Sequence, residues 1–131
     1  MEKAKEVGQA NKTLYSEDNL WVEIMSTNPG EVKVGLTDAF QKAFGEIEFV
    51  RILPRGRYIG KGNPIGSLES GRKIILLRAP VSGSIQSVND ELRAQPELIN
   101  KSPRDQGWLA VIKPIKIEED LKTLLSKPAE V

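Results

Sequence analysis

The chain has 131 residues, of which 39% are hydrophobic and 28% charged, a composition typical of a single folded domain. Its 19 basic and 18 acidic residues leave a net charge of +1, which is too small to attract nucleic acid or an anionic membrane surface. It contains no histidine and no cysteine, which excludes disulfides, thiolate metal sites and the usual general base near neutral pH.

We therefore expect a protein that is not an enzyme and binds no metal. Carboxylates remain as candidate acids and bases, but Glu46, Glu48 and the run Glu118-Glu119-Asp120 have the pattern of a solvated polar face. The charged first residues are followed by no apolar run of signal-peptide length, and no stretch approaches the ~20 apolar residues of a membrane span. These features predict a cytoplasmic protein.

The first half of the chain predicts a hairpin and a helix. Apolar and polar residues alternate from Leu20 to Leu36, which predicts a β-hairpin with its turn at Asn28-Pro29-Gly30. A short helix over residues 38–44 should follow, capped by Thr37 and ended by Gly45.

Short strands separated by turn residues are predicted next, over residues 47–52, 58–59, 65–69, 73–78 and 83–88. Such brief strands favour a sandwich or barrel over βαβ units. Beyond them the chain should be helical or irregular, with Asn89 as a candidate helix cap and breaks at Pro96 and Pro103. A last strand is predicted over residues 108–112, and an amphipathic helix over residues 118–126.

Several segments, read in chain order, resemble successive blocks of the glycine-cleavage H-protein family. They are residues 15–22 (YSEDNLWV), 34–39 (VGLTDA), 45–50 (GEIEFV), 66–70 (GSLES), 79–83 (APVSG), 88–89 (VN), 96–100 (PELIN) and 107–109 (GWL). The resemblance implies a mainly β fold with short helices, a barrel-sandwich hybrid of the lipoyl/biotinyl type with a C-terminal helix. We expect a flexible N-terminal segment (residues 1–13), one domain (14–126) and a C-terminal tail (127–131).

The resemblance also implies a non-catalytic carrier, in which a lysine at the tip of a protruding hairpin is acylated by lipoic acid. Such a carrier shuttles intermediates between larger partner enzymes of a multi-enzyme system. The family's Glu-Ser-Val-Lys pattern falls on Glu69-Ser70-Gly71-Arg72. Arginine thus stands where the family has its lipoyl-lysine, and Lys73 comes next. Ile74, Ile75, Leu76 and Leu77 replace the small and acidic residues that follow the lysine in the family.

Two interpretations of this site follow. In the first, Gly71 relaxes the turn so that Lys73 moves to the tip and becomes the lipoylated residue. In the second, Arg72 holds the tip, and Lys73, one step along a strand, points to the opposite face. We favour the second, because a one-residue slip in a hairpin reverses every side chain. Lipoate is thus expected as a covalent cofactor only if Lys73 is modified.

Asn19, the two tryptophans and a group of basic residues give weaker indications of structure or function. Asn19 stands where the family commonly has histidine, and is expected to be a turn or capping residue. Trp21 and Trp108 are expected to be core residues beside strands. A basic region could receive an acidic partner; its members are Arg51, Arg55, Arg57, Lys61, Arg72, Lys73 and Arg78.

Two further functions stay open at this stage. Relatives of H proteins include lipoate-binding proteins that serve sulfur-oxidising heterodisulfide-reductase-like complexes. Alternatively, the chain is an unlipoylated paralogue of the H protein that acts as a binding or regulatory module.

Overall fold

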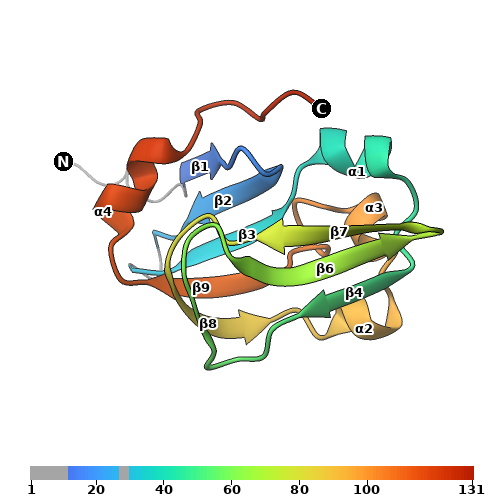
Figure 1. Ribbon diagram of the computed structural model, residues 1–131, viewed down its shortest axis with the longest axis horizontal. Helices are drawn as coiled ribbons and strands as arrows, with labels where there is room; N and C mark the ends of the chain where they lie inside the picture. Colours follow the sequence, from blue (N-terminus) through green and yellow to red (C-terminus); the bar gives the residue numbers. More distant parts are fainter. Residues whose placement is uncertain (1–11, 27–29) are drawn as a thin grey trace.

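The computed structural model describes residues 12–26 and 30–131, which form two antiparallel β-sheets and a few short helices (Figure 1). The six-stranded sheet has the order β1-β2-β3-β9-β8-β5. In that order its strands are Lys12–Tyr15, Leu20–Ile24, Val32–Leu36, Ala110–Pro114, Gly83–Val88 and Tyr58–Ile59. The three-stranded sheet has the order β4-β6-β7, with strands Phe49–Ile52, Pro64–Ser70 and Lys73–Arg78. The predicted mainly β fold is confirmed.

The helices are α1 (Asp38–Phe44), α2 (Glu91–Ala94), α3 (Leu98–Lys101) and α4 (Ile117–Asp120), followed by a 3-10 turn at Leu121–Thr123. No helix in the described part of the chain is both long and apolar enough to cross a membrane.

The predicted hairpin is present as β2 and β3, which pair from Leu20 with Leu36 to Ile24 with Val32. Two of the residues predicted for its turn, 28 and 29, lie outside the described residues. β1 adds to β2 on the other side and begins at Lys12, ahead of the domain boundary expected at residue 14. The sheet therefore includes residues 12 and 13, and the rest of the predicted N-terminal segment lies outside the described residues.

Helix α1 begins and ends at the predicted residues. The Thr37 side chain accepts a hydrogen bond from the Phe40 N–H at 3.4 Å, which caps the first turn. Gly45 has φ of +106° and donates its N–H to the Gln41 carbonyl at 3.0 Å. Residues with side chains rarely adopt this conformation, so glycine ends the helix cleanly.

The core lies between the two sheets and combines apolar residues from both of them. Its fully buried members include Leu20, Leu36, Ile65, Leu68, Leu77, Ile85 and Ile112. Burying a side chain of this size stabilises the fold by about 1.5–3 kcal/mol. Because β6 and β7 contribute Ile65, Leu68 and Leu77, the hairpin they form rests on this core.

Two predicted strands have boundaries that differ from the structure by two residues. β4 begins at Phe49 and not at residue 47, because Ile47 is buried and donates its N–H to Asn100 Oδ1 at 2.8 Å. The last strand runs from Ala110 to Pro114 and not over residues 108–112. The final residue, Pro114, pairs with Gly83 of β8. β3, on the other side of β9, pairs only as far as Ile112, so no β3 residue needs the N–H that proline lacks.

The predicted C-terminal helix is present but shorter than expected, because α4 ends at Asp120 and a 3-10 turn carries the helical chain only to Thr123. Leu125 instead exchanges two backbone hydrogen bonds with Tyr15, at 2.8 and 2.6 Å, and this pairing needs an extended chain. Asp120 is only 1% exposed, so its assignment to a solvated face was wrong. Its carboxylate accepts the Ser82 N–H at 2.9 Å, which satisfies both buried groups.

The segment after β8 is helical and irregular, as predicted. The N-cap position of α2 is Asp90 and not the predicted Asn89. The Asn89 side chain, one residue earlier, accepts the Glu91 N–H at 3.3 Å. The same side chain donates to the Gln106 and Trp108 carbonyls at 2.8 and 2.9 Å, so it also fixes the loop that leads into β9.

Candidate functional site

The β6–β7 hairpin projects at one end of the molecule, with its turn far from α4 (Figure 1). Ser70 pairs with Lys73, so only Gly71 and Arg72 form the turn. Gly71 has φ of +59°, whereas Arg72 has a negative φ. A positive φ at the first position alone is the pattern of a type II′ turn, which matches the twist of antiparallel strands and favours glycine at that place.

The turn is held by a carboxylate from the chain just before β4. Glu48 accepts the Gly71 N–H at 2.9 Å through Oε1, and its own N–H donates to the Glu69 carbonyl at 2.8 Å. Glu48 is exposed, as predicted for a polar face. Its two contacts nonetheless tie the hairpin tip to the neighbouring strand, which restricts how far the turn can move.

Arg72 occupies the tip and is exposed. Lys73 is the first residue of β7 and shares the inward side with Ile75 and Leu77. Its Nζ donates to the Phe44 carbonyl and lies 4.9 Å from the centroid of the Phe44 ring. A cation is favourable at this place, because the last carbonyls of a helix carry partial negative charge. The Lys73 side chain is exposed, and its ammonium lies against the end of α1.

Asn100 supports the end of α1 on which Lys73 rests. Besides accepting the Ile47 N–H, it donates to Gln41 Oε1 at 2.8 Å and to the Gly45 carbonyl at 3.0 Å. Sequence reasoning did not assign this role, although residues 96–100 belong to a block that resembles the H-protein family. Because the partners lie more than 50 positions away along the chain, no local pattern indicates the contact.

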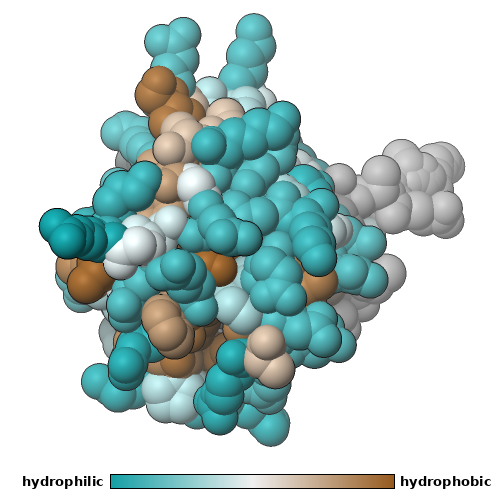
Figure 2. Space-filling model, turned by 90° about the vertical axis from the view of Figure 1, so that its right-hand side faces the viewer, coloured by the Kyte–Doolittle hydropathy of each residue, from teal (hydrophilic) through white to brown (hydrophobic). Residues whose placement is uncertain are grey.

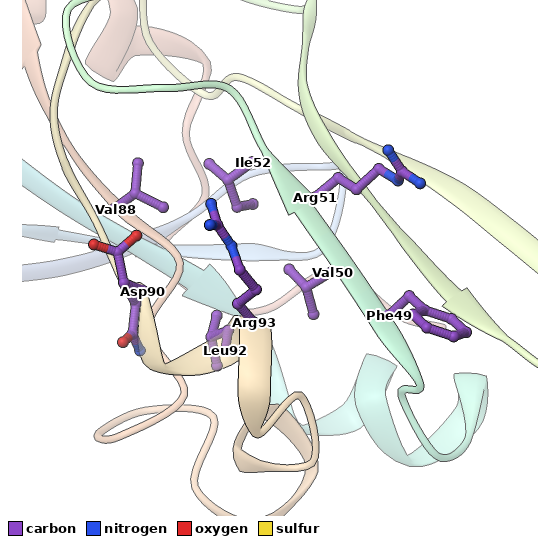
Figure 3. A pocket seen from close by; sticks show the side chains of 9 residues that line it. Phe49, Val50, Arg51, Ile52, Val88, Asp90, Leu92 and Arg93 are labelled. Carbon is purple, nitrogen blue, oxygen red and sulfur yellow. The ribbon is translucent and has the colours of Figure 1, made fainter.

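The outward face of the three-stranded sheet carries two rows of side chains set by the strand register. Phe49 pairs with Glu69, which pairs with Ile74. Arg51, Ser67 and Leu76 form the second row in the same way. We call these six positions the outer face. Figure 3 shows the side chains of Phe49 and Arg51 pointing to one side of β4, while Val50 and Ile52 point to the other.

A groove of about 420 Å³ lies on the opposite side of β4, between this strand and α2 (Figure 3). Its floor is apolar, with Val50, Ile52 and Leu92, and Asp90 and Arg93 stand at its rim. Asp90 is the one carboxylate among the lining residues, so the groove holds no carboxylate pair for acid–base work. Among the described residues, no group of three or more His, Cys, Asp or Glu side chains could hold a metal ion.

Asn19, Trp21 and Trp108 occupy positions that support the fold. Asn19 is a turn residue with φ of +71°, as expected. Trp21 is fully buried and donates its indole N–H to the Pro103 carbonyl at 2.9 Å, which confirms the core assignment. Trp108 is only half-buried, with Lys33 Nζ 5.4 Å from its ring centroid. It therefore lies at the edge of the core.

The basic residues do not form one surface. Arg51, Lys73 and Arg78 belong to the three-stranded sheet, and Arg72 to its tip. Arg55, Arg57 and Lys61 lie in the loops on either side of β5. The Lys61 ammonium contacts the Thr123 hydroxyl, near the C-terminal segment. Only part of the predicted basic region therefore belongs to the hairpin sheet.

Comparison with known proteins identifies the family. The family model described as glycine cleavage H-protein matches residues 13–130. Glycine cleavage system H protein 2 of Aquifex aeolicus is 38% identical over 117 residues, which cover 88% of this chain and 71% of that protein. The probable glycine cleavage system H protein of Pyrococcus furiosus is 37% identical over 115 residues, which cover 88% and 84%.

The same similarity holds in three dimensions. The crystal structure of a glycine cleavage system H protein from Mycobacterium marinum matches with a TM-score of 0.73 at 32% identity, covering 79% of this chain and 84% of that chain. The predicted lipoyl-type barrel-sandwich fold is therefore confirmed. On the family model, the sequence relatives and the shared fold together, the chain belongs to the glycine cleavage H-protein family.

Proposed function

We propose that the chain is a non-catalytic module that binds larger partner enzymes through its β6–β7 hairpin and carries no covalently attached lipoate. One observation carries the proposal: the two-residue turn places Arg72 at the tip and begins β7 at Lys73. A carrier needs an exposed primary amine at the tip of its hairpin. A delocalised guanidinium is not readily acylated, so Arg72 does not replace a lysine there.

The surroundings of Lys73 support the same conclusion. Its ammonium is held by the Phe44 carbonyl and ring, on the inward side of β7. To present this amine at the tip, the turn would have to shift by one residue. That slip would reverse the side chains of β7 and expose Leu77, which is now 1% exposed. Exposing such a side chain costs about 1.5–3 kcal/mol.

A second candidate function is a lipoyl carrier that uses Lys73. One observation favours it: the Lys73 side chain is exposed, so releasing its ammonium from the end of α1 removes few contacts. The amine would then reach solvent beside the hairpin without a change of register. A role in a sulfur-oxidising heterodisulfide-reductase-like system stays an untested alternative.

An acylation assay separates these functions. The wild-type protein and three variants, Lys73→Arg, Arg72→Lys and the double variant Arg72→Lys/Lys73→Arg, are incubated with a lipoate ligase, lipoate and ATP. Intact mass and peptide mapping over residues 69–78 then report the product. We expect no adduct on the wild-type protein and one lipoyl group on residue 72 of the double variant.

Two outcomes would refute the proposal. A lipoyl group on Lys73 of the wild-type protein, absent from Lys73→Arg, would establish the carrier function. A double variant that stays unmodified while folding normally would show that the residue type at the tip does not decide acylation.

A further inference from the structure

Strand β7 lies at an edge of its sheet, with β6 on one side only. Ser70 and Lys73 close a two-residue turn and so form a hydrogen-bonded pair. Pairing in antiparallel strands alternates, so the N–H and C=O groups of Ile74 and Leu76 point away from β6. Among the described residues, neither takes part in a backbone hydrogen bond outside the strand pairs. This row of free groups is a template for another strand.

The side chains beside this free edge are apolar and exposed. Ile74 is 65% exposed, Leu76 is 52% exposed, and Phe49 in the same outer face is 62% exposed. Figure 2, which views the molecule from the hairpin end, shows apolar patches separated by hydrophilic side chains. Apolar side chains that gather next to an open strand edge are typical of an interaction site.

The charges around the edge are mainly positive. Arg72 lies at one end of β7 and Arg78 at the other, and both are exposed. Arg51 occupies the same row as Leu76. Glu69 is the one acidic side chain of the outer face, and it is half-buried between Phe49 and Ile74. Complementarity therefore calls for a partner with apolar side chains at its centre and carboxylates at its ends.

A second copy of the chain fits this edge poorly. Two β7 strands that pair around a twofold axis at Ile75 bring Ile74 opposite Leu76 of the second copy, which is favourable. The same pairing brings Arg72 opposite Arg78 on both sides, and like charges placed directly opposite are destabilising. A shift of the axis along the strand avoids this clash only by shortening the paired region.

We propose that the free edge of β7 binds an extended segment of a partner protein, which adds to the β4-β6-β7 sheet as a fourth strand. The segment has apolar side chains that cover Ile74 and Leu76, and acidic side chains that meet Arg72 and Arg78. Main-chain hydrogen bonds to β7 provide affinity, and the alternating side chains provide specificity. This inference rests on the proposed function, in that the hairpin acts through protein contacts.

The test uses the full chain, uniformly labelled with nitrogen-15, and a synthetic peptide with alternating valine and threonine at its centre and glutamate at both ends. We expect the peptide to shift the amide resonances of β7, to slow hydrogen exchange at Ile74 and Leu76, and to bind more weakly as salt is raised. A peptide with lysine in place of glutamate should bind at least about tenfold more weakly.

A double variant, Ile74→Thr/Leu76→Thr, keeps β-forming residues at both positions but removes the apolar contacts. We expect it to bind the acidic peptide about tenfold more weakly than the wild-type protein. Ile115→Thr is the matched control, because Ile115 is 64% exposed and lies outside the hairpin sheet. It should bind as the wild-type protein does.

Four results would overturn the inference: no binding of the acidic peptide, equal binding of the lysine peptide, resonance shifts confined to residues outside the β4-β6-β7 sheet, or a dimer of the free protein that the double variant abolishes. These results differ from those that refute the proposed function. A lipoyl group on Lys73 refutes only the proposal that the chain carries no lipoate. If the wild-type protein is unmodified but does not bind the acidic peptide, only the proposal of a docking edge on β7 is refuted.

Discussion

Replacing Asn100 with alanine should destabilise the protein, because this side chain joins α3, the end of α1 and the chain before β4. It makes three hydrogen bonds, at 2.8 Å to the Ile47 N–H, 2.8 Å to Gln41 Oε1 and 3.0 Å to the Gly45 carbonyl. Each contributes about 0.5–1.5 kcal/mol net. Asn100 is half-buried, so water can replace part of this network, and we expect a loss of about 2–3 kcal/mol in all.

Urea unfolding followed by tryptophan fluorescence measures this loss, and thermal melting gives a second reading. For a domain of this size, about 1 kcal/mol corresponds to roughly 3–5 °C in Tm, so Asn100→Ala should melt roughly 6–15 °C below the wild-type protein. Hydrogen exchange at the Ile47 amide should also become faster, because the amide loses its acceptor.

Lys101→Ala is the matched control, because Lys101 is the next residue of α3 and is exposed. Its effect should stay within about 0.5 kcal/mol. If Asn100→Ala and Lys101→Ala unfold at the same urea concentration, the Asn100 network does not support the end of α1, and the reasoning is wrong.

Three further changes test other parts of the structure. Gly35→Ala should cost about 1–3 kcal/mol in urea unfolding, because its methyl group would collide with the buried indole ring opposite it. Asp120→Ala should cost about 1–3 kcal/mol in the same assay, because it leaves the buried Ser82 N–H without its acceptor. Hydrogen bonding from the Gln41 side chain, followed by that from the lysine one turn later, lowers the pKa of Asp38 below its usual value of 3.8. The wild-type protein should thus lose its stability advantage over Asp38→Asn as the pH falls below that value and through the lowered pKa, as urea titrations at several pH values would show.

For each of these three predictions, a specific outcome would contradict the reasoning. Gly35→Ala with wild-type stability would mean that the Trp21 ring moves aside freely. Asp120→Ala should be compared with Glu119→Ala, whose side chain is exposed, and equal losses would contradict the buried role of Asp120. For Asp38→Asn, a stability difference that stays constant across the acid range would contradict the lowered pKa.

Local pattern was sufficient for most of the β structure. Alternation of apolar and polar residues predicted β2 and β3, and turn residues predicted where β7 and β8 begin and end. Thr37 and Gly45 predicted both ends of α1, because capping depends on the residue type at a single position. β1 was not predicted, although its register with β2 is regular.

Tertiary contacts decided where the predictions failed. The leucines at 121, 124 and 125 predicted a helix, but the pairing of Leu125 with Tyr15 extends the chain there. The Asp120 carboxylate was assigned to solvent, since nothing near it in the sequence indicates the Ser82 amide. A local pattern also does not show that Lys73 rests on the Phe44 carbonyl, 29 positions earlier.

The measurement that tests the central claim most directly is the intact mass of the protein isolated from its native host, with peptide mapping over residues 69–78. We expect a single species at the mass of the unmodified chain, because Arg72 holds the tip and Lys73 lies on the end of α1. A species heavier by one lipoyl group, mapped to Lys73, would contradict the account and identify the chain as a lipoyl carrier.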